Sequence, residues 1–241
     1  LFTEQMCRFI INISVPSILI KYYTHVLCHS SLTNLIKQYT TAIIQQIKVD
    51  SNSIIQNINE DYEEILDTLV NSHDEISNSI VEILTYIYKI DKNIDRNFDI
   101  NLMNNISSNI INHLNSSISV WRIYEKFGKI VEVICTNHLD IAIKYNYFDS
   151  IVSIILEFYN STTGNVANEN INLSSFLNSM NILIDSINSQ ESLDKLILII
   201  DFYGEKIIPH QPSFKALLKN GVLKNKIPAN FLSLINETTI I

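Results

Sequence analysis

Glycine and proline are scarce in this chain of 241 residues, with four of each. An average composition would supply about 17 glycines and 12 prolines. Hairpins and β-sandwiches need turn residues about every 8 to 12 positions, whereas long helices joined by polar turns tolerate their absence. The scarcity therefore argues against a β architecture, although the 45 isoleucines favour strands by intrinsic propensity.

Cysteine is also rare, and the three residues Cys7, Cys28 and Cys135 show no disulfide-framework spacing. An odd number of cysteines without such a framework favours a reducing compartment. The chain begins Leu-Phe-Thr, without a methionine or a basic segment. We therefore expect a C-terminal fragment of a longer protein that carries no signal peptide and is not secreted.

Long apolar runs that could span a membrane are missing. The longest uncharged run, residues 100–121, contains six asparagines, five serines and a histidine. Transfer of so many polar side chains into the hydrocarbon core of a membrane is unfavourable. The formal net charge is −8, so no basic stripe is expected to displace the counterions of a nucleic acid. Acidic residues concentrate in residues 50–99, and five lysines follow between Lys206 and the end of the chain.

Apolar residues at steps of three and four predict amphipathic helices along most of the chain. The clearest patterns cover residues 32–47, 54–69 and 76–88. Further helices are expected at residues 1–13, 17–29, 99–118, 173–188 and 191–204, and at "SFKALLKNG". The stretch 116–160 predicts two or three helices with breaks near Asn137 and Asn146, and a surface loop is expected near residues 160–170. The sequence thus predicts an all-α protein, one domain of about ten helices without an internal repeat of fixed period.

Two pairs of metal-ligand residue types occur at helical spacing: His25 with His29, and Cys135 with His138. If the two helices met, the four side chains could bind zinc tetrahedrally. These spacings match no established zinc finger, so the alternative interpretation is partly buried side chains beside a core. We expect no metal site, and keep the four residues as a weak alternative.

No catalytic motif is complete. Each of the four glycines is isolated and none flanks a serine, which argues against a nucleophile elbow and a phosphate-binding loop. Pairs of acidic residues fall on faces expected to be solvated, where nothing raises a pKa for acid catalysis. We therefore expect a protein that binds rather than catalyses, with no cofactor.

The stretch "ESLDKLILIIDFYGEKIIP", residues 191–209, is apolar around most of a helical wheel. One interpretation is a central helix wrapped by others. The other is the wall of an interior cavity filled by the acyl chains of a phospholipid, since an empty apolar cavity is costly. The candidate tail contacts are Leu193, Leu196, Ile197, Ile200, Phe202, Tyr203, Ile154 and Phe158, and the candidate headgroup contacts are Arg122, Lys126, Lys129, Lys215 and Lys219.

The abundance of isoleucine, asparagine and tyrosine, at 45, 29 and 11 residues, is typical of proteins from AT-rich poxviruses. The opening "LFTEQMCRFIINISVPSILIKYYTHVL" resembles the C-terminal domain of a poxvirus virion membrane assembly protein. The resemblance implies a helical fold that holds phospholipid in a large apolar cavity, a role in viral membrane assembly, and a location at assembly sites in the host cytoplasm. It assigns no individual site residue.

Two function classes follow. The first is a non-catalytic phospholipid-binding protein of viral membrane assembly, with a membrane surface and other assembly proteins as partners. The second is a helical protein-interaction module, such as a host-factor decoy or virion scaffold, whose apolar groove takes a partner helix. An enclosed cavity would favour the first class, and an open apolar groove over a filled interior would favour the second.

Overall fold

The computed structural model describes residues 5, 6, 9, 33–49, 69, 74–90, 120–162, 173–187, 189–204 and 212–220. These residues are almost entirely helical and include no strand, which confirms the all-α class for this part of the chain. Chain contacts divide the protein into two compact units, Leu1–Phe98 and Asp99–Ile241. The expected single domain, its helix count and an enclosed cavity stay predictions.

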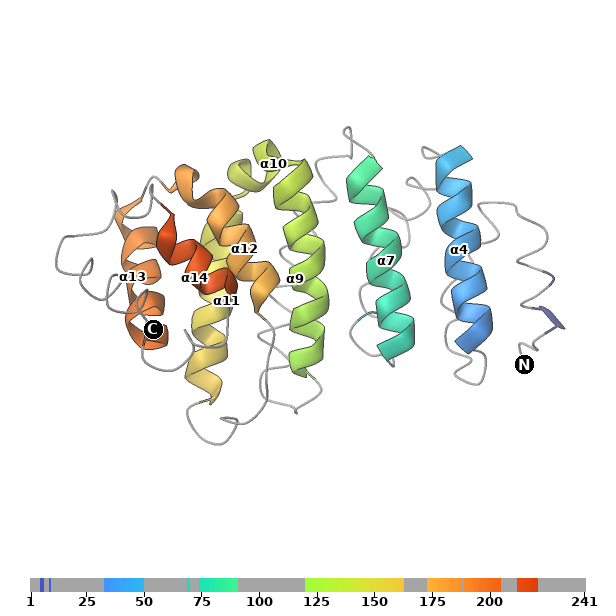
Figure 1. Ribbon diagram of the computed structural model, residues 1–241, viewed down its shortest axis with the longest axis horizontal. Coiled ribbons are helices and arrows are strands. Elements are labelled where there is room, and N and C mark those ends of the chain that lie inside the picture. Colours follow the sequence, from blue (N-terminus) through green and yellow to red (C-terminus); the bar gives the residue numbers. More distant parts are fainter. Residues whose placement is uncertain are drawn as a thin grey trace. The chain divides into compact units, whose positions relative to one another are not determined.

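In the first unit, α4 (Thr33–Val49) packs against α7 (Asp74–Ile90) (Figure 1). One stripe of α4, formed by Tyr39, Ile43 and Ile47, is almost fully buried, as the steps of four in the sequence predict. On α7 the buried stripe includes Ile80, Leu84, Ile87 and Tyr88. These apolar stripes explain why residues of ordinary helix propensity form two stable helices.

The two helices of this pair run parallel. The Thr40 hydroxyl shares a buried hydrogen bond with the Ser79 hydroxyl, and the Lys48 ammonium lies 5.8 Å from the centre of the Tyr86 ring. Moving from the first contact to the second goes toward the C-terminus on both helices. Antiparallel helices would reverse that order.

The second unit contains a layer of three helices, in which α12 (Ser174–Leu183) lies between α9 (Val120–Asn137) and α14 (Pro212–Lys219) (Figure 1). Gly128 brings α9 close to α12, because a Cβ atom there would lie 3.2 Å from Ser175 Cβ and 3.4 Å from the Phe176 ring. Farther along, Asn178 Nδ2 donates a hydrogen bond to Glu132 Oε1 at 2.8 Å. The order of these contacts shows that α9 and α12 are also parallel.

A second layer is formed by α11 (Tyr147–Thr162) and α13 (Gln190–Gly204), which pack on each other, and α11 also packs on α12. The short helix α10 (Leu139–Lys144) joins the two layers. A single turn of 3-10 helix, η2 (Ile184–Ser186), follows α12. The Ser189 hydroxyl then caps α13 by accepting a hydrogen bond from the backbone N–H of Ser192 at 3.0 Å.

The predicted breaks at Asn137 and Asn146 are confirmed. Helix α9 ends at Asn137, and the N–H of the next residue, His138, still donates to the carbonyl of Ile134 at 2.8 Å. Asn146 has a positive φ of 52°, which asparagine tolerates better than most residues. Its side-chain amide donates to Asp149 Oδ2 at 2.6 Å at the start of α11. The chain therefore turns twice within ten residues.

Contacts between parallel neighbours recur at similar sequence separations. The hydrogen bonds between Thr40 and Ser79, between Glu132 and Asn178, and between Asn181 and Asn220 join residues 39, 46 and 39 positions apart. The last bond brings the C-terminal end of α14 beside the C-terminal part of α12, as parallel packing requires. Stacked helix pairs can give contacts of this kind. The separations of 39 and 46 residues differ, so the absence of an internal repeat of fixed period stays a prediction.

The other predicted helices agree with the structure where it describes them. The predictions at residues 32–47, 76–88, 173–188 and 191–204 correspond to α4, α7, α12 with η2, and α13. The helix in "SFKALLKNG" is α14. The helices expected at residues 17–29 and 99–118 and the loop near residues 160–170 lie wholly or mostly outside the described residues, as do most of those at residues 1–13 and 54–69.

Candidate interaction surface

The candidate lipid-tail residues lie on two helices that pack together. Leu193, Leu196, Ile197 and Ile200 on α13 and Ile154 on α11 are all buried, with Leu196 fully inaccessible. Phe158 belongs to α11, and Phe202 and Tyr203 belong to α13, but their side chains lie outside the described residues. The structure therefore buries every predicted tail residue whose side chain it describes.

Helix α13 is not apolar on all sides. Glu191, Asp194 and Leu198 form its exposed stripe, with Lys195 at the edge of that stripe. Lys195 Nζ makes an ion pair with Glu191 at 2.8 Å, one helical turn away. Leu198 is 58% exposed, so the break in the apolar surface includes one member of the run "LILII". The continuous apolar run in the sequence therefore does not reveal that one face of α13 is exposed to solvent.

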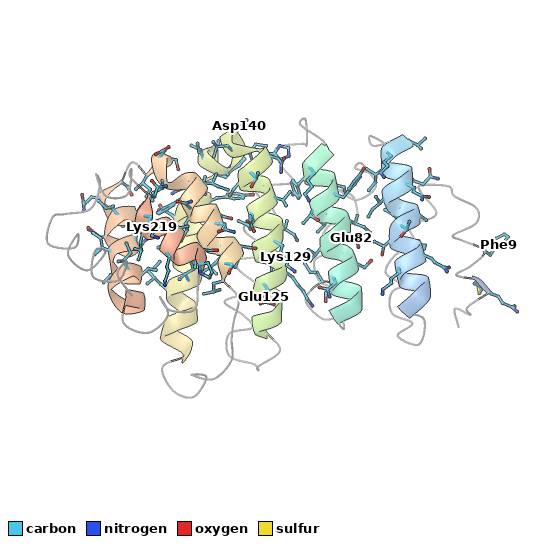
Figure 2. The ribbon with its side chains drawn as sticks, viewed as in Figure 1. Phe9, Glu82, Glu125, Lys129, Asp140 and Lys219 are labelled. Atoms are coloured by element: carbon cyan, nitrogen blue, oxygen red, sulfur yellow. The ribbon has the colours of Figure 1, made fainter. Side chains whose placement is uncertain are left out.

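The candidate headgroup residues do not form one cluster. Lys126 and Lys129 come from α9, whereas Lys215 and Lys219 come from α14, on the other side of α12 (Figure 2). Lys126 is buried, Lys215 is half-buried, and Lys129 and Lys219 are exposed. The fifth residue, Arg122, lies on α9 with its side chain outside the described residues.

The weak zinc alternative can be followed for two of its four ligands. Cys135 on α9 is fully buried, and this burial raises the pKa of its thiol to about 12, although a hydrogen bond with Ser179 acts in the opposite direction. Zinc binds the thiolate form, which this environment disfavours. His138 is buried at the end of α9, while His25 and His29 lie outside the described residues. Among the residues that the structure describes, no three His, Cys, Asp or Glu side chains are grouped as a metal site needs.

A row of polar side chains crosses the three-helix layer of the second unit. We call it the asparagine row and define it as Glu132 on α9, Asn178 and Asn181 on α12, and Asn220 after α14. Asn178 Nδ2 donates to Glu132 Oε1 at 2.8 Å, and Asn220 Nδ2 donates to Asn181 Oδ1 at 2.7 Å. All four side chains are half-buried. The row thus joins three helices at the solvent boundary of the layer.

The geometry of α12 explains why the row can reach both neighbours. Positions three apart on a helix differ by about 60° around its axis, so they diverge slightly while staying on one face. Asn178 accordingly bonds to α9 and Asn181 to α14. The opposite face of α12 carries Phe176, Met180 and Leu183, which are all buried. Leu177, one turn before Asn181, is also buried, so the row lies at the edge of the packed part of α12.

Two further apolar side chains are exposed on α10. Leu139 and Ile143 stand one turn apart and are 42% and 45% exposed. Asp140 and Lys144 form the neighbouring exposed row of the same helix, and Ile141 and Ala142 hold its buried side. The sequence analysis missed both this pair and the asparagine row. The three-residue spacing of Asn178 and Asn181 was visible, but 29 asparagines gave no reason to choose these two.

Comparison of the chain with models of known families, with curated proteins and with solved structures gave no match. Over the described residues, no helix combines the length and the apolar character that crossing a membrane requires.

Proposed function

We propose that this chain is a helical protein-interaction module. The observation that carries the proposal is the parallel packing of helices at separations of 39 to 46 residues, which occurs in both units. Stacked helical repeats use the inner residues of each helix for stability and leave the outer positions free to vary. Their outer faces therefore suit recognition of another protein, and this inference rests on architecture rather than on a catalytic site.

The outer faces of the second unit offer distinct contact chemistries. The layer of α9, α12 and α14 presents the asparagine row, α10 presents Leu139 and Ile143, and α13 presents Leu198 beside charged residues. Exposed apolar groups with polar neighbours are common in protein interfaces. Each face can be altered without touching the buried residues of its helix, so the proposal can be tested face by face.

The test compares partners captured by the wild-type chain with those captured by three surface variants, after chemical cross-linking. The variants are Leu139→Ser/Ile143→Ser on α10, Leu198→Ser on α13, and Asn178→Ala/Asn181→Ala on α12. An interaction module predicts at least one partner that one variant loses and the other two retain. Identical captures by all four proteins would contradict the proposal, because a specific partner must depend on some face.

Phospholipid binding is the second candidate function, and it is favoured by the joint burial of Leu193, Leu196, Ile197 and Ile200 on α13 with Ile154 on α11. Such burial is expected both for a core filled by protein and for a cavity filled by acyl chains. The proposed role in viral membrane assembly, at sites in the host cytoplasm, belongs to this candidate and comes from the resemblance described above.

Extraction of the purified protein with organic solvent, followed by mass spectrometry, tests the second candidate. A lipid-free helical protein from the same expression host serves as the control. About one or more phospholipids per chain would support a lipid-filled cavity, on the scale of known ligand pockets. An extract that matches the control would leave α11 and α13 as an ordinary protein core. Elemental analysis of the same sample tests the weak zinc alternative, which requires about one zinc per chain.

A further inference from the structure

We propose that Asn220 is a site of spontaneous deamidation, and that its hydrogen bond to α12 sets the rate of this modification. Asn220 follows Lys219, the last residue of α14 (Figure 2), and precedes Gly221. No other asparagine among the 29 in the sequence is followed by glycine. Because glycine has no Cβ atom, its backbone nitrogen is the least hindered of those that follow an asparagine. The inference concerns a covalent change and does not depend on the proposed interaction function.

The reaction needs only this pair of residues and water. The Gly221 nitrogen loses its proton and attacks Asn220 Cγ, so that an N–C bond forms. The Cγ–Nδ2 bond breaks, Nδ2 takes up a proton and leaves as ammonia, and a cyclic imide remains. Water then opens the imide at either carbonyl carbon. Opening at Cγ gives aspartate, whereas opening at the backbone carbonyl carbon gives isoaspartate, in which the main chain runs through Cβ and Cγ.

The folded chain restrains the group that leaves. Asn220 Nδ2 donates a hydrogen bond to Asn181 Oδ1 on α12 at 2.7 Å, and the Asn220 backbone N–H donates to the carbonyl of Leu217 at 3.1 Å. The side chain is half-buried. Attack on Cγ requires the side chain to rotate about its Cα–Cβ bond, and the bond to α12 opposes that rotation. Deamidation therefore requires this hydrogen bond to open first.

The same contact determines what the modification does to the fold. Nδ2 is the donor of the bond between α14 and α12, and deamidation replaces it by a carboxylate oxygen. Two acceptor oxygens would then face each other until the Asn181 amide turns its own donor toward the new carboxylate. The added negative charge also lies at a helix C-terminus, where it is unfavourable. The modified chain should therefore hold the end of α14 less tightly on α12.

The experiment incubates the purified whole chain in mildly alkaline buffer, because the attacking nitrogen must lose a proton. Samples taken over time are digested, and mass spectrometry measures aspartate and isoaspartate at the position of Asn220. A synthetic peptide of residues 215–226 gives the rate of the same sequence without the fold.

Four variants separate the causes. Asn181→Ala removes the acceptor on α12, whereas Asn181→Asp keeps one. Asn178→Ala is the matched control, since it makes the same change on the same helix at an amide that is bonded to Glu132 rather than to Asn220. Gly221→Ala tests the chemistry, because a Cβ atom hinders the attacking nitrogen.

We expect deamidation of Asn220 in the wild type at a lower rate than in the peptide. A hydrogen bond of ordinary strength corresponds to about a two- to tenfold change in rate, so Asn181→Ala should react faster than the wild type by about this factor. Asn181→Asp and Asn178→Ala should stay within about twofold of the wild type, and Gly221→Ala should react most slowly. Asn220→Asp, which is one of the two products, should unfold at a lower temperature than the wild type.

The proposal is overturned if Asn220 stays unmodified in the whole chain while the peptide reacts completely. Equal rates in Asn181→Ala and the wild type would also overturn it, because the bond to α12 would then not restrain the reaction. Circular dichroism shows whether Asn181→Ala is folded. If it is not, Asn181→Leu takes its place in the comparison, since leucine keeps the volume of the side chain and removes the acceptor.

Discussion

Gly128 provides the sharpest test of the α9–α12 packing. A Cβ atom at this position would lie 3.2 Å from Ser175 Cβ and 3.4 Å from the Phe176 ring. Gly128→Leu adds four carbon atoms at this contact. Overpacking of this kind costs about 1–3 kcal/mol, while replacing glycine by leucine inside a helix gains less than about 1 kcal/mol. The packing cost outweighs the gain, so we expect a net destabilisation of about 1–2 kcal/mol.

Thermal unfolding followed by circular dichroism measures this effect. For a chain of this size, 1 kcal/mol corresponds to about 2–4 °C in Tm, so the expected decrease is about 2–8 °C. Lys129→Leu is the matched control, because it introduces the same side chain at the next, exposed position. It should change the stability by no more than about 0.5 kcal/mol.

A second substitution locates the cost. Ser175→Gly removes the nearest atom, Ser175 Cβ, and should make Gly128→Leu less costly by about 0.5–1 kcal/mol in a double-mutant cycle. If Gly128→Leu is at least as stable as the wild type, or if Ser175→Gly does not reduce its cost, the close approach of α9 and α12 is wrong. The parallel arrangement of α9 and α12 would then no longer be supported by the contact at Gly128, which is one of the two contacts from which it was inferred.

Three further predictions concern single residues. Leu196→Ala should lower the free energy of unfolding by about 2–5 kcal/mol, because the side chain is fully buried on α13. Leu198→Ala replaces a side chain that is 58% exposed on the same helix and should lower it by no more than about 0.5 kcal/mol. Equal decreases in urea unfolding would refute the assigned faces. Ser189→Ala removes the cap of α13 and should cost about 1 kcal/mol, while Ser189→Gly should lose only a few tenths; an unchanged unfolding midpoint for the alanine variant would contradict the cap. Burial raises the pKa of the Cys135 thiol from 9.0 to about 12. The contribution of this thiol to the free energy of unfolding is therefore constant below pH 9 and is lost as the pH rises toward 12. The free energy of unfolding should therefore fall by up to about 1.4 kcal/mol per pH unit more in the wild type than in Cys135→Ala, and parallel pH profiles would refute this.

The individual helices could be predicted from the sequence because their signals are local. The steps of four among Tyr39, Ile43 and Ile47 identify one face of α4, and the same residues are buried in the structure. The turn at Asn146 could also be predicted, since asparagine tolerates a positive φ. These features depend on residues within a turn or two of one another.

The candidate site could be predicted only in part. The burial of Leu193, Leu196 and Ile200 follows from their apolar side chains and spacing. The exposure of Leu198 does not follow, because it depends on which direction of α13 has no neighbouring helix. Nor does the burial of Lys126, since a lysine is almost always expected at the surface. Both outcomes are decided by packing between elements.

The contacts between neighbouring helices could not be predicted, because they do not require similar residues. A hydroxyl pair joins Thr40 to Ser79, whereas an amide and a carboxylate join Asn178 to Glu132, and two amides join Asn220 to Asn181. The constant element is the direction and spacing of the helices, which many residue combinations can satisfy. The sequence therefore does not indicate which helices pack side by side.

Parallel packing also explains how the asparagine row can form. When neighbouring helices run in the same direction, positions at the same height come from equivalent parts of each helix. Glu132 and Asn178 therefore meet, and Asn181 meets Asn220 at the C-terminal end of the next helix. Each helix added to such a layer extends its outer surface by one packing distance of about 8–10 Å, so the polar contacts across the layer are set by which side chains stand at the same height on neighbouring helices.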